Sequence, residues 1–165
     1  MDEQYTLNGR HGPLVELSAL ETPFAASGVA TVKVTRRGVE ELLELPIQSV
    51  DIEEVNQLVG IPPKIPRVAT GGNPKFIDDP NDPGYQAKLQ AHNRRFVMAM
   101  ACMGLAIPIK DKQGEIVWSA DNTVRQLDKA IEALRQMGIV YSQIFSITRA
   151  INDLTTIAEE AATQE

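Results

Sequence analysis

The chain has 165 residues, enough for one compact domain or for one domain with a small appendage. Hydrophobic residues make up 43% and charged residues 23%, which is typical of a globular protein and argues against a disordered chain. The net charge of −6 argues against a general nucleic-acid-binding protein, which presents a basic face to phosphates.

The N-terminal third predicts a small β-containing portion. Residues 1–28 are expected to be irregular, with a short strand at LVEL, residues 14–17, as an alternative. Apolar and polar residues alternate in VATVKV, as in a half-buried strand, and ELLELPI is expected to be the returning strand. Pro46 places this second strand at a sheet edge, because proline cannot donate to a ladder. The inward-facing positions are predicted to be Ala30, Val32 and Val34 on the first strand, and Leu43, Leu45 and Ile47 on the second.

A short helix is expected to complete the portion formed by residues 29–59. Asp51 and Glu54 have the spacing of a capping box, and Gly60 supplies a stop signal. The apolar stripe of this helix is formed by Ile52, Val55 and Val59.

Residues 60–82 differ in composition from the rest of the chain. The longer stretch 60–84 carries six prolines and four glycines, so it is predicted to be a linker or an extended arm. We expect it to divide the β-containing portion from a C-terminal helical portion, since a long structureless stretch is unusual inside one domain. An arm that becomes ordered only on a partner is the alternative.

The stretch DDPNDPGY, residues 78–85, raises the question of a metal site. An EF-hand loop requires oxygen ligands at its first, third and fifth positions and glutamate at its twelfth, and this sequence fails in either register. Helix capping fits instead, with Asp82 as the N-cap and Pro83 at the first helical position. Asp78 and Asp79 add negative charge near the positive end of the helix. A weak cation site and a partner contact are the alternatives.

Residues 83–158 are predicted to form a helical domain. Its first helix runs from Pro83 to Met103, and the apolar second half must be enclosed by other elements or by another chain. A short β-hairpin is expected near 107–118, with Gly114 in its turn.

An αα-hairpin follows in the predicted helical domain. Ser119 or Asp121 is expected to cap its first helix, and the second helix starts near Tyr141 or Ser142. Residues 159–165 form an acidic tail that we expect to fray. The apolar positions of the two helices are Val124, Leu127, Ile131 and Leu134, then Ile144, Ile147, Ile151, Leu154 and Ala158.

No residue set in the sequence predicts a catalytic, cofactor-binding or metal site. Cys102 lies in the apolar stretch 96–107 and is expected to be an inert buried thiol. His92 with Arg94 and Arg95 could bind an anion, but a solvated polar stripe is preferred, as it is for the Arg36–Arg37 pair. His11 lies in the irregular start.

Three methionines within six residues allow two interpretations. Met98, Met100 and Met103 either fill the core, which we prefer, or line a groove for an apolar segment of another protein.

The sequence gives no sign of a membrane or secreted protein. The stretch 96–107 is the longest apolar run and is shorter than the roughly 18 residues that span a bilayer. The first residues lack the apolar core of a signal peptide, and a lone cysteine favours a reducing compartment. We therefore expect a cytoplasmic protein.

Two further stretches are FIDDPNDPGYQAKLQAHNRRFVMAM and LRQMGIVYSQIFSITRAINDLTTI. The first resembles the D-P-D-P-x-Y segment and following long helix, and the second the C-terminal helix pair, of the phage tail assembly chaperones of siphophage and prophage tail operons. The resemblance covers about residues 30–158. It implies a small N-terminal β portion before a helical part and a non-enzymatic function. It also implies that the protein binds apolar helices of the tape measure protein during tail assembly.

The sequence thus predicts an α+β fold, mainly α, that acts by binding protein. A structural virion component, such as a tail-completion or connector subunit, is the alternative function, and an unrecognised enzyme is a third. A homo-oligomer is left open, and no cofactor, nucleic acid or membrane is expected as a partner.

Overall fold

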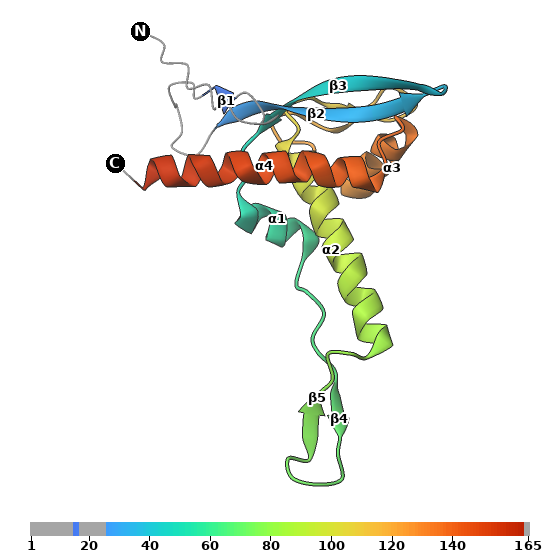
Figure 1. The fold of residues 1–165 in the computed structure, drawn as a ribbon, viewed down its shortest axis with the longest axis vertical. Coiled ribbons are helices and arrows are strands. Elements are labelled where there is room, and N and C mark those ends of the chain that lie inside the picture. The colour runs from blue at the N-terminus through green and yellow to red at the C-terminus, as the bar shows by residue number, and fades with distance from the viewer. Residues whose placement is uncertain (1–14, 17–25, 164–165) are drawn as a thin grey trace.

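The protein has an α+β fold that is mainly helical, as predicted (Figure 1). The computed structural model describes residues 15–16 and 26–163. The elements, in chain order, are β1 (Val15–Glu16), β2 (Ser27–Arg36), β3 (Val39–Gln48), α1 (Ile52–Val59), β4 (Arg67–Ala69), β5 (Phe76–Asp78), α2 (Pro83–Gly104), β6 (Ile109–Lys110), β7 (Ile116–Trp118), α3 (Leu127–Gln136) and α4 (Tyr141–Ala162).

The largest sheet is antiparallel with strand order β1-β2-β3, and the predicted β2–β3 hairpin is confirmed. The short β1 strand lies within the alternative considered for residues 14–17, whereas the rest of residues 1–25 lies outside the described residues. The alternation on β2 is confirmed, because Ala30, Val32 and Val34 are buried and the residues between them are exposed.

Pro46 lies on an edge strand, as predicted. It pairs with Val29 of β2, and its carbonyl accepts a hydrogen bond from the Ala106 N–H at 2.9 Å, on the side away from β2. Pro46 therefore removes no donor from the β2–β3 ladder.

One continuous core joins the β-containing and helical portions, so the predicted division of the chain at residues 60–82 is wrong. Helix α4 covers one face of the β2–β3 sheet and also packs on α2 (Figure 1). The predicted apolar positions of α4 are all buried. Two buried threonines add polar ties: Thr148 Oγ1 donates to the Val97 carbonyl, and Thr155 Oγ1 accepts from the Val50 N–H.

The helix boundaries agree with the sequence except around α3 and at the C-terminus. Asp51 accepts a hydrogen bond from the Glu53 N–H at the start of α1, and Gly60 ends that helix with φ +88°. Neither Ser119 nor Asp121 caps α3, which begins later, at Leu127. Helix α4 continues to Ala162, so residues 159–162 of the predicted acidic tail are helical. No described helix is both long and apolar enough to cross a membrane.

Residues 60–82 form an ordered arm and not a structureless linker. Strands β4 and β5 pair antiparallel, and the Arg67 and Asp78 side chains form an ion pair at 3.1 Å. The N-terminal half of α2 carries this hairpin away from the body of the molecule (Figure 1). Sequence patterns did not predict these two strands, because each is only three residues long and lies among prolines.

The α2–α4 crossing depends on Gly104. A Cβ atom at this position would lie 2.7 Å from both the Cγ1 and Cγ2 atoms of Ile151, which is fully buried. Such a distance is well below van der Waals contact, so the two helices approach closely only because the side chain is absent.

Gly104→Ala is therefore expected to lower the free energy of unfolding by about 1–3 kcal/mol, because the methyl group overpacks the crossing. Chemical denaturation would measure this loss. Gly72→Ala is the control, since a Cβ there meets nothing within 4 Å. The Gly104→Ala/Ile151→Ala double variant should lose less stability than the two single changes summed, because the truncated isoleucine leaves room. Full additivity would contradict the proposed clash.

Candidate protein-binding surfaces

Asp82 caps α2 as predicted, whereas Asp78 and Asp79 make other local contacts. Asp82 accepts a hydrogen bond from the Tyr85 N–H at 2.6 Å, which caps α2 with Pro83 in the first turn. Asp78 pairs with Arg67, and Asp79 accepts from the Asn81 N–H. The three carboxylates are thus directed to three different partners.

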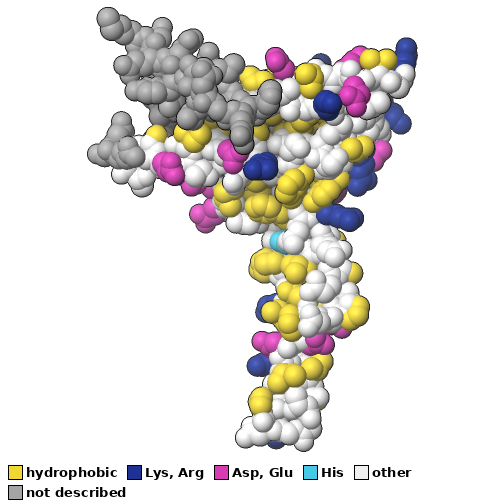
Figure 2. Space-filling model, in the orientation of Figure 1, with side chains coloured by type: hydrophobic (Ala, Val, Ile, Leu, Met, Phe, Trp, Pro, Cys, Tyr) yellow, Lys and Arg dark blue, Asp and Glu magenta, His cyan; other side chains and the backbone are white. Residues whose placement is uncertain are grey.

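The arm exposes large apolar side chains. Ile61 is 87% exposed and Phe76 is 54% exposed, although both belong to an ordered part of the chain. Figure 2 shows apolar side chains along this projecting part of the molecule. Exposed apolar residues that gather on one part of a molecule are candidates for contact with a partner. The exposed apolar side chains of the arm are Ile61, Ile65, Val68, Phe76 and Ile77.

A second exposed apolar surface lies at the turn between α3 and α4, and we call it the turn patch. It consists of Met137, Val140, Tyr141 and Phe145. Tyr141 and Phe145 are one helical turn apart and therefore share a face of α4. The Arg94 guanidinium of α2 lies 5.8 Å from the centre of the Tyr141 ring, which is cation–π distance.

The methionines do not form a groove. Met98, Met100 and Met103 are all buried in the core, so the preferred interpretation as core residues is confirmed. Helix α2 has an apolar second half because α4, α1 and α3 of the same chain enclose it. These methionines therefore offer no surface to another protein.

The two arginines of α2 have separate partners. Arg95 pairs with Asp128 of α3 at 2.6 Å, and Arg94 lies over Tyr141. His92 is half-buried. This arrangement favours the polar-stripe interpretation over an anion site. Arg37 lies in the β2–β3 turn with φ +52°, and His11 is outside the described residues.

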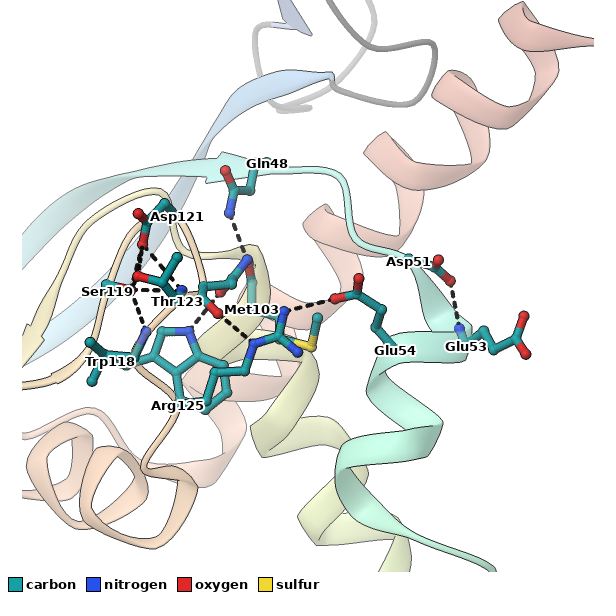
Figure 3. A network of polar contacts seen from close by, with 12 residues as sticks. Gln48, Asp51, Glu53, Glu54, Met103, Trp118, Ser119, Asp121, Thr123 and Arg125 are labelled. Carbon is teal, nitrogen blue, oxygen red and sulfur yellow. Dashed lines mark hydrogen bonds and ion pairs between the residues drawn. The ribbon is translucent and has the colours of Figure 1, made fainter.

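A cleft of about 730 Å³ lies between the β3–α1 connection, the end of α2, the loop after β7 and α4. Figure 3 shows the polar contacts among residues at this cleft. Gln48 Nε2 donates to the Met103 and Ala120 carbonyls, and Arg125 forms an ion pair with Glu54 at 2.8 Å. Glu54 therefore tethers the cleft wall instead of closing the predicted capping box.

Residues 119–124 form a tight hydrogen-bonded loop at the cleft. The Ser119 hydroxyl donates to Asp121 at 2.6 Å, and the Thr123 hydroxyl donates to the same oxygen at 2.8 Å. These bonds, that of Ser119 first, lower the pKa of Asp121. A lowered pKa means that the carboxylate favours the folded loop above the ordinary pKa of 3.8, and that this preference is lost as the pH falls through the lowered value.

Asn122 joins the loop to the core. Its side chain accepts a hydrogen bond from the Trp118 indole N–H at 2.7 Å and donates to the Met103 carbonyl at 3.2 Å. Its backbone has φ +59°, a region that asparagine tolerates better than most residues. Sequence reasoning missed this role, although the Asp-Asn pair after Trp118 is a turn signal.

The cleft residues therefore have structural partners. The lining contains no histidine, cysteine or lysine, and within the described residues no group of three potential metal ligands occurs. Every buried side-chain nitrogen or oxygen atom in the described part of the chain has a hydrogen-bond partner. The exposed arm and turn patch are stronger candidates for function than the cleft.

Asn122→Ala is expected to lower the free energy of unfolding by about 2–4 kcal/mol, because it leaves the buried Trp118 N–H unpaired and places alanine at positive φ. Asn122→Gly should cost less, since glycine removes the backbone strain but not the lost hydrogen bond. Thermal and chemical denaturation would measure both. Asn152→Ala, at an exposed position of α4, is the control. If the alanine and glycine variants lose the same free energy of unfolding, backbone strain at position 122 does not contribute to the cost of the alanine.

Cys102 is fully buried, and burial raises the pKa of its thiol to about 12. The thiolate is the reactive form, so the native protein should not react with a thiol-specific reagent at pH 8, whereas the urea-unfolded protein should react completely. Absorbance of the released chromophore would follow the reaction. Rapid labelling of the native protein would contradict the enclosed position of α2.

No family model, curated protein or solved structure significantly matches this chain.

Proposed function

We propose that this protein is a non-enzymatic phage or prophage tail assembly chaperone in the cytoplasm of the bacterial host. Its partner would be an apolar helical segment of the tape measure protein, held until the tail tube polymerises around it. The observation that carries this proposal is the exposure of large apolar side chains, in the arm and the turn patch, on a chain whose core is already closed.

The turn patch suits an apolar helix as its ligand. Tyr141 is 45% exposed and Phe145 is 55% exposed, and both lie on the first turns of a 22-residue helix that the core holds rigidly. An amphipathic helix that docks on such a surface contributes residues at the same helical spacing. Arg94 restricts the Tyr141 ring before binding, which reduces the entropy lost on association.

The charge of the chain also supports this function. A net charge of −6 favours solubility while the protein covers an aggregation-prone segment. The segment is then held by apolar contact, and the acidic carrier limits association between loaded complexes.

A structural virion subunit, for tail completion or connection, is the second candidate. The observation that favours it is the ordered arm, because a projecting hairpin with exposed apolar residues suits contact with a neighbouring subunit.

Co-expression with the tape measure protein of the same operon tests the first candidate. The wild-type chain should raise the soluble fraction of the tape measure protein, and Tyr141→Ser/Phe145→Ser should abolish most of this gain because it removes the apolar contact. Ile116→Ser/Val124→Ser is the matched control, since it removes two other exposed apolar side chains. Equal effects of the two variants would contradict the turn patch as the binding surface.

Mass spectrometry of purified particles separates the two candidates. A chaperone should be missing from mature particles, whereas a structural subunit should be present in a fixed ratio to the other tail proteins. If the tape measure protein gains no solubility and this protein is retained in mature particles, the structural subunit replaces the chaperone as the favoured function.

A further inference from the structure

The turn patch lies in a basic part of an acidic protein. Helices α2 and α3 and residues 137–152 together carry six basic and two acidic residues, whereas the net charge of the chain is −6. Both acidic residues have partners: Asp128 pairs with Arg95 at 2.6 Å, and Glu132 accepts a hydrogen bond from the Gln136 side chain at 2.9 Å. The surface around the turn patch is therefore positive.

Three arginines lie next to the apolar side chains of the turn patch. The Arg94 guanidinium is 5.8 Å from the centre of the Tyr141 ring. Arg149 is exposed one helical turn after Phe145 and shares its face of α4, and Arg135 is exposed in the last turn of α3, before the patch begins. Figure 2 shows Lys and Arg side chains beside apolar ones over this part of the molecule. None of the three arginines forms an ion pair within the described residues.

The neighbouring elements restrict how an acidic ligand can lie on this surface. The β2–β3 hairpin carries three basic and three acidic residues, so it adds no net charge. The acidic residues of α4, which are Asp153, Glu159 and Glu160, all belong to the second half of the helix. Like charges repel, so an acidic ligand is favoured across the first half of α4 towards α2, and disfavoured along the second half of α4.

We propose that the turn patch binds a helix whose apolar stripe is flanked by aspartate and glutamate residues. The stripe contacts the four apolar side chains of the patch, and the carboxylates meet Arg94, Arg135 and Arg149. Arginine suits this contact, because its planar guanidinium can donate two parallel hydrogen bonds to one carboxylate. The inference rests on the proposed function, since it names the chemistry of the helix that the patch would hold.

The two parts of the surface have different effects on binding. Burial of the apolar stripe supplies most of the affinity, whereas the arginines select among apolar helices by the charges beside the stripe. A nucleic acid or an anionic membrane fits less well, because each extends beyond the positive surface and meets a chain of net charge −6. A single helix can contact the positive part alone.

A matched pair of synthetic peptides tests the proposal. Each is about 18 residues long and has one leucine stripe at helical spacing, and the two differ only in having glutamate or lysine beside the stripe. Fluorescence anisotropy of the labelled peptides with the full chain at low salt measures the dissociation constants. The wild type should bind the glutamate peptide about tenfold or more tightly than the lysine peptide, because three attractive contacts become repulsive. Tyr141→Ser/Phe145→Ser should weaken binding of the glutamate peptide, because it removes the apolar contact.

Charge reversal at the patch decides whether the arginines set this preference. Arg135→Glu/Arg149→Glu should bind the lysine peptide more tightly than the glutamate peptide, and a gain of this kind requires a folded variant. Lys64→Glu/Lys75→Glu changes two exposed lysines of the arm and has the same change in net charge, so it is the control and should keep the wild-type preference. An equal shift in the control would show that net charge sets the preference, and would overturn the proposal.

Failure of this inference can be distinguished from failure of the proposed function. Equal binding of the two peptides would overturn the acidic partner but leave the turn patch as a surface for an apolar helix. Absence of binding by both peptides would overturn the inference, and the co-expression experiment would then decide the chaperone function by itself. Binding to phosphatidylserine vesicles in place of the glutamate peptide would identify a lipid surface and would also overturn the inference.

Discussion

The close crossing of α2 and α4 at Gly104 and Ile151 is the contact on which the rest of the structure depends. Helix α4 covers the β2–β3 sheet and α2 at the same time, so this crossing joins the two portions of the chain in one core. Overpacking at this crossing would disturb more than two helices. Thr148 and Thr155 of α4 also make hydrogen bonds to α2 and to the β3–α1 connection, and both depend on the position of α4.

The same crossing determines what is exposed. The last seven residues of α2, from Met98 to Gly104, are buried, whereas its first half leaves the body. A continuous helix of 22 residues is roughly 33 Å long, so α2 acts as a fixed spacer between the core and the β4–β5 hairpin. Apolar side chains on a rigid spacer lose little conformational entropy on binding, which makes their exposure useful to a partner.

Much of the fold follows from local sequence signals. The alternation on β2, the edge position of Pro46 and the Asp82 cap each depend on neighbouring residues, and the structure has all three. The predictions failed where tertiary contacts, and not local sequence, determine the arrangement of the elements. Separate β and helical portions were expected because Pro- and Gly-rich residues intervene, but α4 crosses back to the sheet. The strands β4 and β5 gave no periodic signal.

The candidate surfaces were harder to predict than the fold for a physical reason. A methionine cluster has the same composition whether it fills a core or lines a groove, and only the position of α4 shows that Met98, Met100 and Met103 are enclosed. The turn patch and the arm pose the same difficulty. Val140 and Tyr141 are adjacent in the sequence, as are Phe76 and Ile77, but adjacent apolar residues do not reveal whether the fold buries or exposes them.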